Sequence, residues 1–216
     1  MKRARSPRAV PEGQRERNKR EKRERLLRAA AELFEKKGFA GATAREICRR
    51  ARIGTGTLFL YARDKRDLLF RVFEGESRRL FSEAAAGVRG DEPIVDGLMR
   101  LFGAFMGFYA AHPVLAHDLI EQFFLRQSDH PDARGLAADY LAHVRVLVEK
   151  AQERQEVRSD RPAAQLGAAF FAHYGFWVQA WLVERAVGRE DADKMLRAAL
   201  ELQLEGARPR RTGGSR

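Results

Sequence analysis

Apolar residues recur every three to four positions along most of the chain, which is the spacing of helices that bury one face. In the first such segment they precede the pair Gly38 and Phe39, typical of a helix end because glycine adopts the left-handed conformation without strain. The apolar stripe consists of Leu26, Leu27, Ala30, Leu33 and Phe34. We therefore predict a first helix from about Asn18 to Lys37.

A capping-box pattern follows, in which the Thr43 hydroxyl accepts from a backbone N–H and Glu46 reaches back to the cap. It predicts a short second helix with outward arginines and an apolar side made of Ile47, Cys48 and Ala51. A third short helix is expected over 55–62, and Asp64 is expected to cap a longer fourth helix.

Prolines and glycines divide the remainder into further helical stretches. The breaks fall at Pro93, Pro113, the loop 126–134, Pro162 and Gly188. No strand pattern competes with these stretches, so the prediction is an all-α fold that ends in a helical bundle.

The second and third helices, joined by a tight turn, are typical of a helix-turn-helix. Gly54 and Gly56 each cost about 1 kcal/mol relative to alanine inside a helix, so they suit a backbone that closely approaches another molecule. The alternative is a helical hairpin in an ordinary bundle, where the glycines mark only the bend.

Charge is distributed unevenly along the chain. The first 70 residues hold 21 Lys and Arg against nine Asp and Glu, a net +12, whereas the whole chain carries +11. A basic head of this kind favours a polyanionic partner, either nucleic acid or an anionic membrane surface. Residues 1–18 are expected to form a basic disordered arm, because Pro7, Pro11 and Gly13 disfavour helix; a merely solvated tail is the alternative.

Composition narrows the class of protein further. With 44% hydrophobic and 33% charged residues the chain reads as globular, and no apolar run reaches the roughly 20 residues of a membrane span. No apolar segment follows the basic start to make a signal peptide, so we expect a cytoplasmic protein without a membrane partner. The single cysteine, Cys48, excludes an intrachain disulfide.

Catalytic and metal-binding patterns are weak. Cys48 is expected to be a small buried side chain, and the i, i+4 pair His117 and Glu121 is expected to be solvated. We therefore predict no enzyme activity, no catalytic residue, no metal and no cofactor. The remaining alternative is a helical lipid-binding or enzymatic protein whose basic head docks on an anionic surface.

Residues 25–70 resemble the TetR-type bacterial transcriptional regulators. The string TAREICRRARIGTGTLFLYARDKRDLL keeps the family's residues in order and spacing at Thr43, Ile47, Ala51, Ile53, Gly56, Thr57, Leu58, Lys65 and Leu68. It departs from the family at four positions. Arg52 replaces a turn glycine, Gly54 a capping serine, Phe59 a phosphate-binding tyrosine and Ala62 a core phenylalanine.

The resemblance implies DNA-binding roles for particular residues. Base contacts are expected from Arg45, Thr55, Thr57 and Leu60, with Gly56 allowing close approach, and phosphate contacts from Thr43, Tyr61 and Lys65. The chemistry agrees, because arginine binds guanine bidentately, threonine and leucine meet the thymine methyl group, and lysine suits phosphate.

The resemblance also implies an effector pocket in the C-terminal bundle. Aromatic residues and histidines on neighbouring helices would line an apolar cavity with a few polar groups, which favours a small hydrophobic or aromatic effector. The expected lining residues are Phe102, Phe105, Phe108, His112, Phe123, Phe124, Tyr140, His143, Tyr174 and Trp177.

The last two predicted helices differ from the others because the segment 163–183 is apolar nearly all round. One face holds Phe170, Tyr174, Trp177 and Trp181, and another holds Ala164, Gly167, Phe171, Gly175, Val178 and Leu182. One of these faces can contact a second subunit, and the resemblance implies a homodimer interface of four helices.

Together these inferences predict four segments. They are a basic arm (1–18), a three-helix helix-turn-helix DNA-binding domain (19–70), a helical-bundle ligand-binding and dimerisation domain (71–206) and a flexible basic tail (207–216). The expected function is that of a homodimeric repressor, released by its effector from an inverted-repeat operator in double-stranded DNA.

Overall fold

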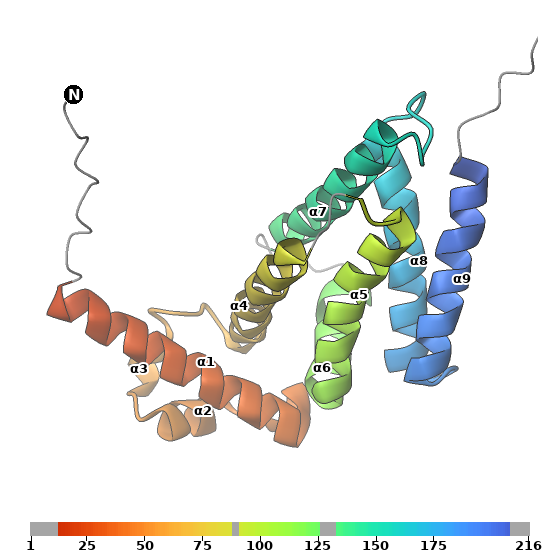
Figure 1. The fold of residues 1–216 in the computed structure, drawn as a ribbon. Coiled ribbons are helices and arrows are strands. Elements are labelled where there is room, and N and C mark those ends of the chain that lie inside the picture. The colour runs from red at the N-terminus through yellow and green to blue at the C-terminus, as the bar shows by residue number, and fades with distance from the viewer. Residues whose placement is uncertain (1–12, 88–90, 126–132, 208–216) are drawn as a thin grey trace, which may run out of the picture.

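The computed structural model describes residues 13–87, 91–125 and 133–207, and within these ranges every regular element is a helix (Figure 1). This confirms the all-α prediction. The elements are α1 (Gln14–Gly41), α2 (Ala44–Ala51), α3 (Thr55–Leu58), α4 (Lys65–Ala86), α5 (Ile94–Ala111), α6 (Pro113–Leu119), the π-helix η1 (Ile120–Leu125), α7 (Ala133–Glu153), α8 (Ala163–Leu182) and α9 (Arg189–Ala207). The expected tail beyond Ala207 lies outside the described residues.

Helix α1 begins earlier than predicted, at Gln14, so the expectation of a disordered arm is wrong for residues 14–18. The reason is that acidic and basic residues stand four positions apart along this segment, which supports a solvated helix. Arg20 and Glu24 form one such i, i+4 ion pair, 3.7 Å apart. Residues 1–12 lie outside the described part of the chain.

Helices α1 to α3 share one core. Leu26 and Phe34 of α1 are fully buried together with Ile47 of α2 and Leu58 of α3. Gly38 breaks α1 with a φ of 71°, as its position before Phe39 predicts. Helix α3 is shorter than expected: it ends at Leu58, and residues 59–61 form turns, not helix.

Helix α4 belongs to both parts of the molecule. Leu68 and Leu69 are buried in the core of the first three helices, whereas Phe81 packs on Phe105 of α5 and Tyr140 of α7. The boundary expected after residue 70 therefore falls inside a continuous helix.

The C-terminal bundle follows the predicted breaks. Pro93 and Pro162 immediately precede α5 and α8, Pro113 is the first residue of α6, and Gly188 precedes α9. Proline fits these places because the first turn of a helix needs no backbone N–H donor. Helix α5 is long and apolar enough to cross a membrane, yet it carries nine buried residues and serves as a core helix.

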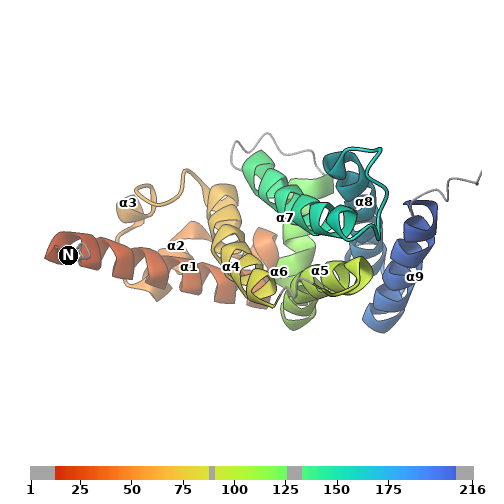
Figure 2. The same ribbon diagram turned by 45° about the horizontal axis from the view of Figure 1, so that its top comes forward.

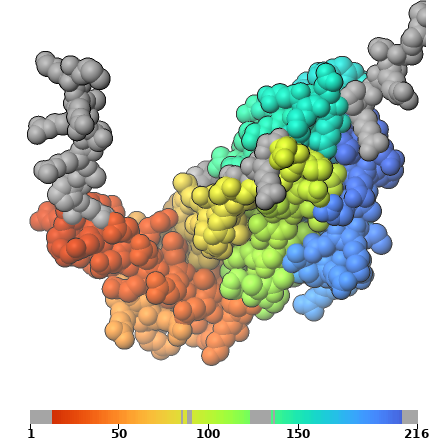
Figure 3. All heavy atoms as spheres, viewed as in Figure 1, coloured from red at the N-terminus to blue at the C-terminus, as the bar shows by residue number. Residues whose placement is uncertain are grey.

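Polar contacts join the bundle to the first three helices at the C-terminal half of α1. The Glu35 carboxylate accepts from the backbone N–H of Leu115 at 3.0 Å, and the Asp118 carboxylate accepts from that of Phe39 at 2.5 Å. Arg66 donates to the carbonyl of Gln122 at 2.7 Å. These contacts tie α1 and α4 to α6 and η1. On either side of this junction, α2 and α3 lie at one end of the molecule and α8 and α9 at the other (Figure 3).

Candidate nucleic-acid interface and effector region

The start of α2 has the predicted capping box. The Thr43 hydroxyl accepts from the Glu46 backbone N–H at 3.2 Å, and the Glu46 carboxylate accepts from the Thr43 backbone N–H, also at 3.2 Å. Lys37 donates to the same carboxylate at 2.6 Å. The hydrogen bonds from Lys37 and Thr43 lower the pKa of Glu46 from 4.5 to about 2. Glu46 is therefore ionised at neutral pH and links the cap of α2 to Lys37 of α1.

Helix α2 presents its arginines to solvent, as predicted. Arg45 and Arg49 are exposed, and neither has an ion-pair partner among the residues that the structure describes. Arg50 pairs with Glu32 of α1 and so belongs to the fold. Arg45 and Arg49 are therefore available to a bound partner.

The surface around α3 combines small and apolar exposed residues. Thr55 and Gly56 are exposed, and a Cβ added at Gly56 would meet nothing within 4 Å. The side chains of Leu60 and Phe59 are 75% and 64% exposed. In the sequence, Phe59 stands out only because it replaces a tyrosine and so lacks a hydroxyl group. Apolar side chains that are this exposed beside α3 are suited to contact with another molecule. Their exposure could not be predicted from the sequence.

Two residues expected to bind phosphate are engaged within the protein. The Lys65 ammonium donates to the carbonyls of Phe39 at 2.7 Å and Ala42 at 3.1 Å, and it lies 4.4 Å from the centre of the Phe39 ring. The Tyr61 hydroxyl donates to the Lys19 carbonyl at 3.3 Å. Lys65 keeps one of its three ammonium hydrogens for another partner, and both phosphate assignments stay predictions.

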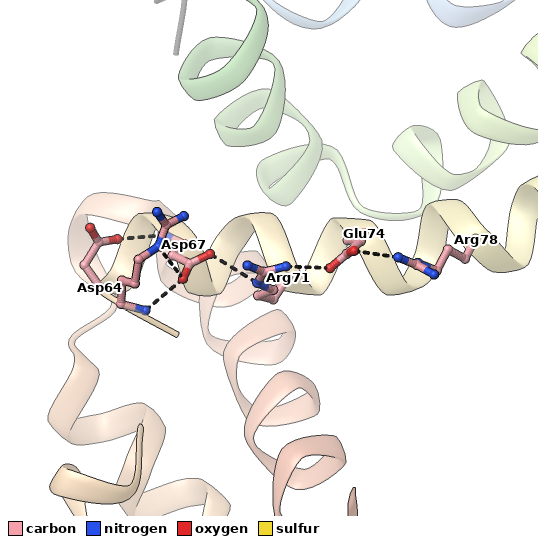
Figure 4. Close-up of polar contacts among 6 residues, drawn as sticks. Asp64, Asp67, Arg71, Glu74 and Arg78 are labelled. Atoms are coloured by element: carbon pink, nitrogen blue, oxygen red, sulfur yellow. Dashed lines mark hydrogen bonds and ion pairs between the residues drawn. The ribbon is translucent and has the colours of Figure 1, made fainter. Parts of the chain in front are cut away.

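Carboxylates fix the beginning of α4 directly after this surface (Figure 4). Asp64 accepts from the Asp67 backbone N–H at 2.7 Å, as its predicted capping role requires. Asp67, whose side chain is 4% exposed, accepts from the backbone N–H of Arg63 at 2.8 Å and pairs with Arg71 at 3.2 Å. Glu74 continues the series with Arg71 and Arg78.

Four of the ten predicted effector residues gather in one buried aromatic cluster: Phe102, Phe105, Tyr140 and Tyr174. Phe102 stacks on Tyr174 with ring centres 4.6 Å apart, and Phe105 lies 4.6 Å from Tyr140. Burial raises the pKa values of Tyr140 and Tyr174 well above 10. The buried Tyr140 hydroxyl makes no hydrogen bond of regular geometry in the described structure, although the Tyr174 hydroxyl lies near enough to affect its pKa.

The other predicted effector residues do not join this cluster. His143 stacks on Phe81 at its edge, with ring centres 4.3 Å apart, and the half-buried Trp177 packs against Phe176. Phe108 and His112 line a separate groove of about 690 Å³ between α1, α4 and the α5–α6 corner. The side chains of Phe123 and Phe124 lie outside the part that the structure describes.

The thiol and the His–Glu pair take no part in these sites. Cys48 is buried as predicted, and burial raises its pKa, so the thiol is not activated. Donor atoms of His117 and Glu121 lie within 4.8 Å of each other and of Asp118. Asp118, however, binds the Phe39 amide and so ties α6 to α1.

The outer face of α8 and α9 is apolar but differs from the expected one. Gly167, Val178 and Leu182 point into the bundle, and a Cβ on Gly167 would lie 3.3 Å from Val144. The exposed large residues are Phe176 of α8 and Met195 and Leu202 of α9, exposed by 61%, 50% and 71%. The two helices lie side by side at the end remote from α3 (Figure 1).

Comparison with known proteins supports the interpretation of the first helices. Residues 26–72 match the family model of the bacterial regulatory proteins of the tetR family. The chain is 27% identical over 143 residues to the HTH-type transcriptional repressor NicS of Pseudomonas putida. That match covers 64% of this chain and 66% of the repressor, just under two thirds of its length.

Solved structures share the whole fold. FadR of Thermus thermophilus, a TetR-family repressor in complex with lauroyl-CoA, is 24% identical with a TM-score of 0.71, covering 90% of this chain and 99% of that one. FadR of Bacillus subtilis in complex with stearoyl-CoA is 18% identical with a TM-score of 0.69, covering 85% and 98%. FadR of Bacillus halodurans is 19% identical with a TM-score of 0.68, covering 93% and 100%.

Proposed function

We propose, from the premise that this chain is a TetR-type transcriptional regulator, that it acts in the cytoplasm as a homodimeric repressor released from its operator by a small hydrophobic effector. The observation that carries the DNA-binding part is the exposed surface of α2 and α3. There Arg45 has no partner among the described residues, and Leu60 is 75% exposed. These two side chains, with Thr55 and Thr57, would read bases in the major groove.

Homodimerisation would occur through α8 and α9. The exposed Phe176, Met195 and Leu202 give this end an apolar surface that a two-fold related copy would cover. Such a dimer would hold two α3 elements in successive major grooves, about 34 Å or a multiple of it apart, so the operator would be an inverted repeat.

The effector would occupy the aromatic region of the bundle. The buried Tyr140 hydroxyl makes no hydrogen bond of regular geometry in the described structure, and a ligand oxygen would satisfy it. Two fold neighbours were solved with acyl-CoA, so acyl thioesters belong in a screen beside aromatic compounds.

Selection from a random duplex library with the full chain tests the DNA-binding function. The expected result is an inverted repeat with half-site centres about 10 base pairs, or a multiple of that, apart. Recovery of no preferred sequence at low salt would contradict the proposal.

A thermal-shift screen followed by titration tests the switch. The best binder should bind less tightly when the selected duplex is present, because coupling between two sites is reciprocal. Equal affinities with and without duplex would mean that this compound does not control DNA binding.

A further inference from the structure

The first three turns of α1 project from the molecule without a core beneath them. All residues from Gln14 to Arg25 are exposed, and Leu26 is the first buried residue of the helix. Residues 14–25 contain seven Lys and Arg against three Glu. Helices normally gain most of their stability from packing, so an exposed basic extension of this length is suited to a partner that covers it.

The cations of this extension fall on distinct faces. One face holds Arg15, Lys19 and Lys22, which are separated from one another by four and three residues, and Lys22 is four residues before Leu26. This spacing places them on the helix face that Leu26 buries against the helix-turn-helix. Arg17 and Arg20 lie on the other side. That side also holds Arg28, which lines the groove toward α4 and α5.

A specific contact fixes the extension beside α3. The Tyr61 hydroxyl, three residues beyond α3, donates to the Lys19 carbonyl at 3.3 Å. Both ribbon views show α3 next to the N-terminal half of α1 (Figures 1 and 2). The stripe of Arg15, Lys19 and Lys22 therefore lies on the same side of the molecule as the exposed Leu60 and Phe59.

We propose that Arg15, Lys19 and Lys22 bind the phosphate backbone next to the bases that α3 contacts, so that α1 lengthens the contact of each protomer with DNA. This inference rests on the proposed function. The stripe spans about 10 Å at 1.5 Å per residue, which is the axial length of about three nucleotides of one strand. Tyr61 acts as a positioning residue that holds the stripe beside α3.

The test uses two matched variants of the full chain and a duplex of arbitrary sequence, about 40 base pairs long to accommodate two half-sites. One variant carries Arg15→Gln, Lys19→Gln and Lys22→Gln, and the other carries Arg17→Gln, Arg20→Gln and Arg28→Gln. Both remove three positive charges, and glutamine keeps nearly the helix propensity of lysine and arginine. Circular dichroism and unfolding midpoints show whether both variants remain folded.

The measured quantity is the slope of the logarithm of the binding constant against the logarithm of the salt concentration. Each lost phosphate contact flattens this slope by about 0.9, so the stripe variant should lose up to about 2.7 per protomer and bind at least about tenfold more weakly. The opposite-face variant should keep a slope close to that of the wild type. Added to the stripe variant, Tyr61→Phe should flatten the slope no further, because Tyr61 acts by holding the stripe in place; additional flattening would instead make Tyr61 itself a phosphate contact.

The outcomes separate the inference from the function on which it rests. Equal slopes for the stripe variant and the wild type, or equal losses in both triple variants, would overturn the stripe assignment while DNA binding stands. A wild-type chain that binds no duplex at low salt would overturn both.

Discussion

Arg52 ends α2 in the left-handed conformation, with φ 56° and ψ 49°. For residues other than glycine this conformation costs about 1 to 2 kcal/mol, because Cβ crowds the carbonyl. The sequence indicates the same strain, because Arg52 replaces the turn glycine that is usual in the tetR family. The turn between α2 and α3 is therefore strained in the free protein.

Arg52→Gly should raise the free energy of unfolding by about 0.5 to 1 kcal/mol, since the relief of strain exceeds the added chain entropy of glycine. Urea unfolding of the full chain measures this. Arg49→Gly, inside α2, is the matched control and should lower stability by about 1 kcal/mol. A loss of stability in both variants would contradict strain at Arg52.

Glu46 ties the cap of α2 to α1, and Lys37 is the largest cause of its low pKa. Because folding lowers this pKa from 4.5 to about 2, the contribution of the ionised cap to stability is fully present above about 4.5 and is lost as pH falls toward 2. Lys37→Met should raise the Glu46 pKa toward 4.5, measured by NMR titration of the carboxyl carbon. An unchanged pKa would assign the shift to Thr43 alone.

Arg45 should contribute base specificity if α2 and α3 read the operator as proposed. Arg45→Ala should cost about 1 to 3 kcal/mol on the selected operator and relax preference at one base pair per half-site. Titration of operator and scrambled duplex measures both effects. Equal losses on the two duplexes would instead make Arg45 a phosphate contact.

At the scale of elements, the first turns of α4 depend on Asp67. This nearly buried carboxylate binds the Arg63 backbone N–H and the Arg71 side chain, whereas Asp64 contributes one capping hydrogen bond (Figure 4). The helix that joins the two parts of the molecule is thus stiffened where it leaves the recognition surface.

Asp67→Ala should lower the free energy of unfolding by about 3 kcal/mol, because it leaves Arg71 without its least exposed partner. Asp64→Ala, the control at the cap, should cost about 1 kcal/mol. Urea denaturation compares the two. Equal small losses would show that Asp67 contributes no more than an ordinary cap.

At the scale of the whole molecule, three contacts couple the bundle to helices α1 to α4: Glu35 to Leu115, Asp118 to Phe39, and Arg66 to Gln122. All three lie where α1 and α4 meet α6 and η1. A movement of α6 would therefore reach the start of α2 through Phe39 and Lys65. If the proposed effector binds in the bundle, these contacts are the route by which it would reorient α3.

Phe176 lies at the centre of the argument for a dimer through α8 and α9, because its side chain is 61% exposed. Phe176→Glu should raise the dimer dissociation constant by roughly a hundredfold, about 3 kcal/mol, because it places two carboxylates in an apolar interface. Analytical ultracentrifugation measures the change. Val146→Glu, at an exposed apolar residue of α7, is the control and should leave association unchanged. Identical behaviour of both variants would place the interface elsewhere.

The sequence by itself determined those features that depend on neighbouring residues. Proline positions predicted the starts of α5, α6 and α8, Gly38 the break in α1, and the spacing of Thr43 and Glu46 the cap of α2. Such signals act through backbone conformation and hydrogen bonds within one turn, so they can be read without the fold. The helix-turn-helix and the resemblance to the tetR family came from the same short segment, which the family model also matches.

Tertiary structure alone decided which partners distant residues found. Lys65 reached carbonyls 23 and 26 residues away, Phe108 and His112 turned to the groove beside α1, and Gly167 packed inward while Phe176 stayed outside. On a helix that is apolar nearly all round, periodicity cannot choose the buried face. The choice came from the packing of α8 against α7 and α9, which no local pattern records.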